Sequence, residues 1–136
     1  MKELKTLKLI KMSYNTSDLS LLDSCFFADL VNLESLIITD YEFFMGKLSK
    51  NFLKGLYNLK SLAIYEVYYI EPNAFDDLIN LEILDLSRNR RLDSIPSNLF
   101  EKLNNLTYVN LTNVWLNQDM HTLFEKNTKL EKIHCA

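Results

Sequence analysis

The sequence predicts an α/β solenoid, with about six short parallel strands on a concave face and loops, short helices or 3-10 turns on a convex face. The first observation is the stretch 81–105, where Leu81, Leu84 and Leu86 give the spacing L-x-x-L-x-L ahead of Asn89. Because side chains alternate along a strand, this spacing points Leu84 and Leu86 inward. One such unit cannot bury its own apolar face, so it requires neighbours.

The second observation is that the same spacing recurs along the whole chain. Units begin near residues 4, 33, 59, 81, 106 and 130. An apolar residue stands three positions ahead of most leading leucines, and a larger apolar residue stands three positions further back. The larger residues are Phe27, Leu53, Phe75, Phe100 and Phe124, and in the last unit Asn127 replaces the expected leucine. With 48% hydrophobic residues to build a core, the sequence predicts one domain over residues 1–136.

The first two units are long and irregular between their strands. Residues 1–12 contain the first strand, and Asp18 or Ser20 is a suitable N-cap for a short helix in the return segment 13–32. The next return segment contains Tyr41, Phe43, Phe44 and Met45, and some of these side chains are needed to fill the core.

The later units are more regular. Residues 59–80 form the shortest unit, in which we expect Tyr69 to replace the leucine after the strand and Ile70 to replace the later isoleucine. Trp115 is expected to be partly buried, and the alternative is a surface anchor on the rim. Cys135 is expected at an inward core position, equivalent to Leu111 one unit earlier.

The longer pattern L-x-x-L-x-L-x-x-N-x-L-x-x-I-P-x-x-x-F-x-x-L-x-x resembles the typical leucine-rich repeat of extracellular proteins. Toll-type receptor ectodomains and secreted insect leucine-rich immune proteins carry this repeat, and the segments 70–75 and 123–127 are also similar to Toll-type repeats. The resemblance implies a leucine-rich repeat horseshoe over nearly the whole chain. It implies less about function, because the repeat serves many unrelated partners. The turn asparagine is present only at Asn89, so the chemistry of a ligand is not carried over.

The outward positions of the predicted strands form the candidate binding surface. Their charge is mixed and their middle is apolar, which suits a protein ligand or receptor partner. A nucleic acid would require a basic stripe with stacking aromatic side chains, so we expect no nucleic-acid partner. The predicted partner-binding residues are Ile37, Ala63, Tyr65, Ile83, Asp85, Arg88, Tyr108 and Asn110.

Catalytic and metal-binding patterns are missing from the sequence. His134 and Cys135 are neighbours on a predicted strand and face opposite ways, so they cannot form a nucleophile–base pair. The sequence contains no glycine-rich phosphate loop and no paired metal-ligand motif. We therefore expect no enzymatic activity, no cofactor and no metal. No stretch of 18 uninterrupted apolar residues occurs, so we expect no direct membrane insertion of this segment.

The cysteines and glycosylation sequons indicate whether the chain is extracellular and whether it is part of a longer protein. Several strands, about 4.8 Å apart, separate the units of Cys25 and Cys135, whereas the α-carbons of a disulfide lie within about 7 Å, so these two are not expected to pair. Disulfide caps are absent, which suggests a fragment of a longer ectodomain or homo-association through uncapped ends. Asn15, Asn105 and Asn110 match the glycosylation acceptor, and a glycan on Asn110 would cover the predicted binding surface.

Three functional interpretations follow from these patterns. The first is an extracellular or cell-surface recognition module of innate-immune, Toll-like character. The second is an intracellular, cytoplasmic scaffold, which the unpaired cysteines and the missing signal peptide favour. The third is a structural segment of a larger solenoid with no ligand of its own. The repeat subtype favours the first.

Overall fold

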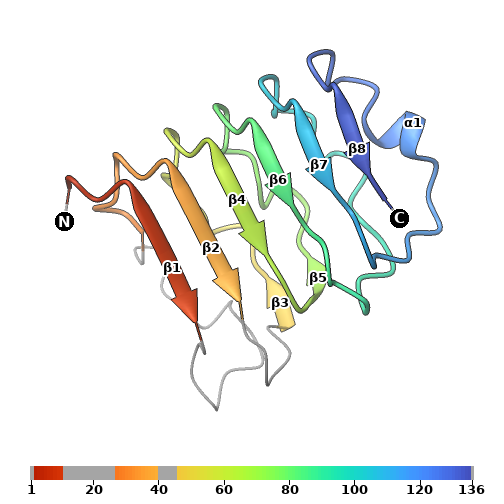
Figure 1. Ribbon diagram of the computed structural model, residues 1–136, viewed down its shortest axis with the longest axis horizontal. Helices are drawn as coiled ribbons and strands as arrows, with labels where there is room; N and C mark the ends of the chain where they lie inside the picture. The colour runs from red at the N-terminus through yellow and green to blue at the C-terminus, as the bar shows by residue number, and fades with distance from the viewer. Residues whose placement is uncertain (1, 11–26, 40–45, 136) are drawn as a thin grey trace.

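The computed structural model describes residues 2–10, 27–39 and 46–135 of the 136-residue chain. Its main element is a parallel six-stranded sheet with the order β1-β2-β4-β6-β7-β8, in which every strand comes from a successive unit (Figure 1). The predicted α/β solenoid of leucine-rich repeats is confirmed. The strands are β1 (Thr6–Ile10), β2 (Ser35–Thr39), β4 (Ser61–Ile64), β6 (Ile83–Asp85), β7 (Tyr108–Asn110) and β8 (Lys132–His134).

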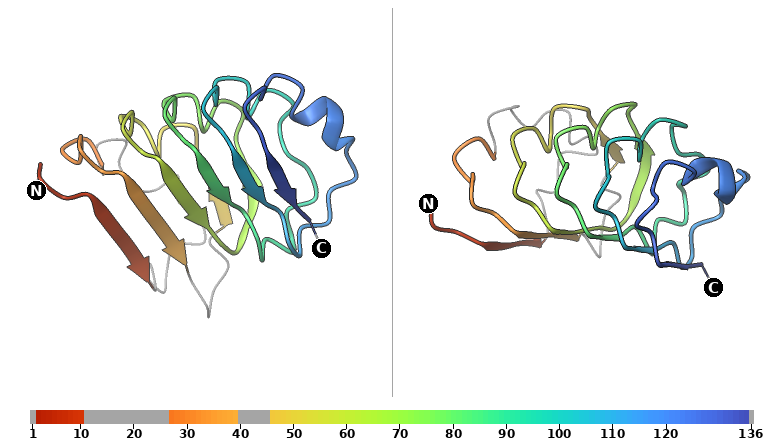
Figure 2. Two further views of the ribbon diagram at one scale, coloured as in Figure 1. Left: turned by 45° about the horizontal axis from the view of Figure 1, so that its top comes forward. Right: turned by 90° about the horizontal axis from the view of Figure 1, so that it is seen from above.

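The return segments form the opposite layer (Figure 2). Two of them pair as a small parallel sheet of β3 (Gly46–Leu48) and β5 (Val67–Ile70). The helix α1 (Met120–Leu123) begins after Asp119, whose carboxylate accepts hydrogen bonds from the backbone N–H groups of the first turn. The helix expected after Asp18 or Ser20, and the fillers expected at 41–45, lie outside the described residues.

The inward leucines form one continuous core between the two layers. On β6, Leu84 is fully buried while Ile83 is 44% exposed, as the alternation along a strand requires. Phenylalanines of successive units stack below the leucines, with ring centroids 6.3 Å apart for Phe75 and Phe100 and 4.7 Å apart for Phe100 and Phe124. In the second unit the ring that meets Phe27 belongs to Phe52, next to the predicted Leu53, and both residues are buried.

Three predictions for single side chains are wrong. Tyr69 is 44% exposed, because the shortened return segment places Val67 and Ile70 in the core instead. Trp115 is 75% exposed, since its two neighbours in the chain are the residues that turn toward the core. Cys135 is exposed rather than buried, because it follows β8, which forms one edge of the sheet.

Asn89 closes the turn after β6 and also binds the preceding unit. Its side-chain oxygen accepts a hydrogen bond of 2.7 Å from the backbone N–H of Val67. Its amide donates to the carbonyl oxygens of Leu86, at 2.7 Å, and of Ile64, at 2.9 Å. Val67 occupies the asparagine position of its own unit and cannot make these bonds, so Asn89 serves two turns.

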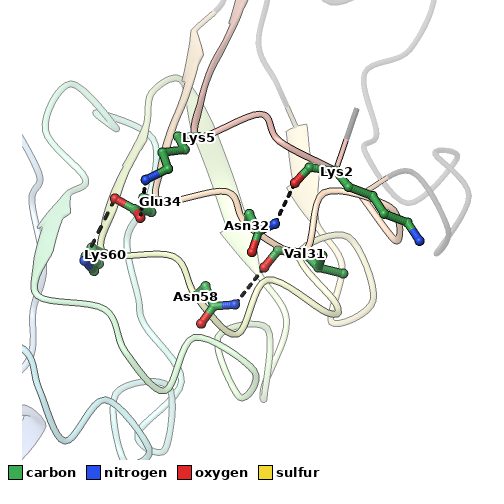
Figure 3. A network of polar contacts seen from close by, with 7 residues as sticks. All are labelled: Lys2, Lys5, Val31, Asn32, Glu34, Asn58 and Lys60. Carbon is green, nitrogen blue, oxygen red and sulfur yellow. Dashed lines mark hydrogen bonds and ion pairs between the residues drawn. The ribbon is translucent and has the colours of Figure 1, made fainter.

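A second set of asparagines, which we call the asparagine ladder, connects the units at the N-terminal ends of the strands. Each amide donates to a backbone carbonyl of the preceding unit (Figure 3). Glu34 lies beside the ladder and pairs with Lys5 at 3.6 Å and Lys60 at 3.9 Å. The four bonds run from Asn32 to Lys2 at 2.8 Å, from Asn58 to Val31 at 2.7 Å, from Asn80 to Tyr57 at 2.7 Å, and from Asn105 to Ile79 at 3.1 Å.

The ion pair between Lys47 on β3 and Glu71 after β5 gives a pH-dependent prediction. The Lys47 ammonium, 2.8 Å from the carboxylate, and the Lys50 backbone N–H hold the pKa of Glu71 below its ordinary value. Because the pKa of Glu71 is lower in the folded protein than in the unfolded chain, ionised Glu71 stabilises the fold at pH values above the ordinary glutamate pKa. This contribution is lost as the pH falls through the pKa of Glu71 in the folded protein. Because the pair is partly exposed, we expect Glu71→Gln to lower the free energy of unfolding by about 0.2–1 kcal/mol at pH 7.

Urea unfolding of wild type and Glu71→Gln at pH 7 and pH 3 measures this effect. The difference between the two proteins should shrink at pH 3. The matched control is Glu125→Gln, at an exposed glutamate for which the structure shows no ion pair with any described residue. A difference that is constant across this pH range would show that the ion pair contributes nothing.

Candidate functional site

The parallel register brings the predicted binding residues together on the outward face of the six-stranded sheet. We call this surface the sheet face. Residues with the same position in each unit lie directly beside one another, because the strands are in register without a shift. One row contains Ile37, Ala63, Asp85 and Asn110, and the adjacent row contains Ser61, Ile83 and Tyr108.

The predicted apolar middle of the sheet face is present but smaller than expected. Ile83 is 44% exposed and contributes the largest accessible apolar side chain there. Tyr108, its register partner on β7, is half-buried, and Ile37 is half-buried two strands away on β2. Ala63 is only 9% exposed, because its short side chain lies between longer neighbours, so it offers little area to a partner.

Tyr65, Asp85 and Arg88 form a polar cluster at the C-terminal ends of β4 and β6. The Tyr65 hydroxyl donates to the Asp85 carboxylate at 3.2 Å. The other carboxylate oxygen accepts a hydrogen bond of 2.9 Å from the backbone N–H of Ser87, which fixes the orientation of Asp85. The Arg88 guanidinium lies 5.7 Å from the centre of the Tyr65 ring. The cluster therefore presents an oriented aromatic ring and a cation next to exposed Ile83.

Asn110 repeats the local geometry of Asp85 one strand further along. Its side-chain oxygen accepts hydrogen bonds from the backbone N–H of Thr112 at 3.0 Å and from the Thr112 hydroxyl at 2.7 Å. Both residues use a short side chain to close the turn that follows their strand. The sequon asparagine Asn105 instead belongs to the asparagine ladder, and its oxygen accepts a hydrogen bond of 2.8 Å from Lys129. Asn15 lies outside the described residues.

Two exposed tyrosines of β5 were not among the predicted binding residues. Tyr68 and Tyr69 are exposed on β5, and cations from the two neighbouring units lie against their rings. The available signal was the pair of tyrosines in a return segment that needs only Val67 and Ile70 for its core, together with the basic run 88–91.

Metal-binding and membrane-spanning features are absent from the part of the chain that the structure describes. Within it, no three histidine, cysteine, aspartate or glutamate side chains come together in a way that would hold a metal ion. None of the helices among the described residues has the length and apolar character needed to cross a membrane.

The comparisons with known proteins agree with this geometry. A model of the leucine-rich repeat family matches residues 67–114. A crystal structure of a TLR13–ssRNA13 complex has 24% sequence identity and a TM-score of 0.76, and the match covers 94% of this chain. The Toll–Spatzle complex of Drosophila has 16% identity and a TM-score of 0.52 over 82% of the chain. An internalin of Listeria monocytogenes has 26% identity and a TM-score of 0.51 over 80% of the chain.

These similarities show a leucine-rich repeat solenoid whose fold resembles those of TLR13 and Toll. The chain spans 17% of the TLR13 chain, 18% of the Toll chain and 32% of the internalin chain. No curated protein is a significant match to the sequence. The expectation of no nucleic-acid partner is not supported, because one of the similar solenoids was solved with single-stranded RNA.

Proposed function

We propose that the chain is a non-catalytic protein-recognition module that binds a protein ligand or receptor partner through the sheet face. The observation that supports this most directly is exposed Ile83, which lies between the Tyr65–Asp85–Arg88 cluster and Tyr108. Aromatic side chains and arginine around an apolar residue that loses its water on binding are the usual composition of a binding hot spot. The proposed contact set is Ile37, Ala63, Tyr65, Ile83, Asp85, Arg88, Tyr108 and Asn110.

Two isoleucines of almost equal exposure make a matched test of this site. Ile83 on the sheet face is 44% exposed, and Ile79 near the asparagine ladder is 45% exposed. Replacing Ile83 with lysine puts a charge at the centre of the proposed contact, and we expect at least a tenfold loss of partner affinity. Ile79→Lys makes the same chemical change outside it, and affinity should stay within about twofold of wild type.

The measurement is quantitative affinity capture from the native source with the two variants and wild type. Circular dichroism of each protein establishes that the variants are folded. If Ile79→Lys loses the captured partner while Ile83→Lys keeps it, the partner binds another surface and the proposed site is wrong.

We further propose an extracellular or cell-surface location in an innate-immune, Toll-like setting. The supporting observations are the similarity to Toll-type ectodomains and the three sequons at Asn15, Asn105 and Asn110. The alternative is an intracellular scaffold, which the exposed free thiol of Cys135 favours.

Peptide mass spectrometry with and without glycosidase, on protein from its native source, separates these two locations. We expect a glycan on at least one of the three sequons, which requires passage through the secretory pathway. A glycan on Asn110, on β7, would cover that part of the sheet face and would restrict the proposed contact to β2, β4 and β6. Complete coverage of all three peptides without a glycan would favour the intracellular scaffold.

A further inference from the structure

Three tyrosines of the unit 59–80 lie between cations supplied by the two neighbouring units. On one side, the Lys47 ammonium is 5.4 Å from the ring centre of Tyr69. On the other side, the Arg91 guanidinium is 5.9 Å from the ring of Tyr68, and Arg88 is 5.7 Å from the ring of Tyr65. We call Lys47, Tyr68, Tyr69, Arg88, Arg90 and Arg91 the tyrosine–cation edge.

The fold itself does not require this edge. Val67 and Ile70, which flank the two tyrosines on β5, are each 1% exposed and supply the apolar contacts of the strand. Tyr68 and Tyr69 are 41% and 44% exposed, so most of their area is not used by the core. Two adjacent aromatic side chains that are held outward, each against a cation, form a prepared contact surface rather than a packing element.

The charge of the edge is positive in a chain whose net charge is −3. Two of the nearby carboxylates already have partners: Asp85 accepts from Tyr65 and from the Ser87 backbone, and Glu71 pairs with Lys47. Arg88 and Arg90 form no ion pair with any carboxylate in residues 2–10, 27–39 and 46–135, although Glu66 and Asp93 lie in the adjoining turns. Their guanidinium N–H groups can therefore donate to an external acceptor.

We infer that the tyrosine–cation edge binds an extended acidic peptide segment of a protein partner. The planar guanidinium matches a carboxylate through two parallel hydrogen bonds, and the tyrosine faces accept the apolar parts of such a segment. The inference rests on the proposed function for the assignment of a protein partner. It extends the proposed contact from the sheet face to an adjoining surface that shares Arg88 with it, and it specifies aspartate or glutamate as the side chains that the edge recognises.

The probe is a fluorescently labelled synthetic peptide of alternating glutamate and tyrosine, and the competing class is represented by a labelled oligouridylate RNA. We expect the peptide to bind wild type with an affinity that decreases with salt concentration. The double variant Arg88→Glu with Arg91→Glu should bind at least tenfold more weakly. Glutamate is suitable at position 88, because Glu66 has the same left-handed backbone, with φ of 64° in both residues, one unit earlier.

The matched control, Lys2→Glu with Lys54→Glu, changes the net charge equally at exposed lysines away from the edge. It should bind the peptide within about twofold of wild type. Replacing Tyr68 and Tyr69 with serine leaves the arginines unchanged and should also weaken peptide binding, which tests the aromatic contribution separately.

Three results would overturn the inference: no peptide binding to wild type, equal weakening by the control variant, or arginine-dependent binding of the RNA but not of the peptide. The last result would assign the edge to single-stranded nucleic acid. The Ile83→Lys variant leaves the edge intact. If this variant still binds the peptide but no longer captures the partner, the two surfaces can be tested independently: loss of peptide binding concerns the tyrosine–cation edge, and loss of partner capture concerns the sheet face.

Discussion

Replacing Phe100 with alanine is expected to lower the free energy of unfolding by about 3–5 kcal/mol. Phe100 is fully buried, and its ring lies between those of Phe75 and Phe124, so its removal leaves a cavity in the stack. Each unit of a solenoid is stabilised mainly by its neighbours, so losing this ring weakens two interfaces at once. Urea unfolding followed by circular dichroism measures the change as a shift of the midpoint.

The control is Trp115→Ala, which removes an even larger aromatic side chain. Trp115 is 75% exposed, so the change should alter the free energy of unfolding by no more than about 0.5 kcal/mol. Similar destabilisation by the two substitutions would mean that the phenylalanine stack is not the main stabilising contact between the later units.

Replacing Asn89 with alanine is expected to lower the free energy of unfolding by about 3 kcal/mol or more. The substitution removes three hydrogen bonds at a residue that is completely buried. The Val67 N–H and the carbonyls of Ile64 and Leu86 then stay in the interior without partners, and each such group costs about 1–3 kcal/mol. Because the side chain bonds to two units, both turns should become more susceptible to hydrogen exchange.

Asn98→Ala is the matched control for this prediction. Asn98 has one side-chain hydrogen bond, of 2.9 Å to Asn73, at an exposed position of the return segments. Its replacement should cost less than about 0.5 kcal/mol. If exchange at Val67 and neighbouring amides is unchanged in Asn89→Ala, the asparagine does not stabilise the preceding unit in the way its geometry indicates.

The leucine spacing was sufficient to predict the strands, their parallel order and the register of the sheet. In a solenoid each position of one unit lies beside the same position of the next, so aligning the repeats is equivalent to aligning the strands. The placement of Ile83 outward and Leu84 inward followed directly from that alignment. The side chains that fill the core in the irregular unit 59–80 could not be predicted in this way. The return segment of this unit is shorter than the pattern, so alignment with the other units placed Tyr69 at a core position that Val67 fills, whereas Ile70 was placed correctly.

The candidate site was predictable in its location and less so in its contacts. The repeat positions assigned Tyr65, Asp85 and Arg88 to the outward face, but they did not give the hydrogen bond from Tyr65 to Asp85 or the position of the guanidinium over the ring. Those depend on side-chain rotamers that no spacing specifies. Tyr68 and Tyr69 were not predicted for a different reason: they lie on β5 in a return segment, outside the main sheet whose outward positions defined the predicted surface.

The asparagine ladder has a consequence for how this chain can change in length. Its four bonds join the same position of successive units, whereas the numbers of residues between those positions differ from unit to unit. Extra or missing residues are accommodated in the return segments. At the N-terminal ends of the strands, the same hydrogen bond joins each unit to the preceding one. Insertions into a return segment should therefore leave the spacing of the strands unchanged. A whole unit that begins with asparagine and leucine could be added or removed, and the remaining units would join through the same bond.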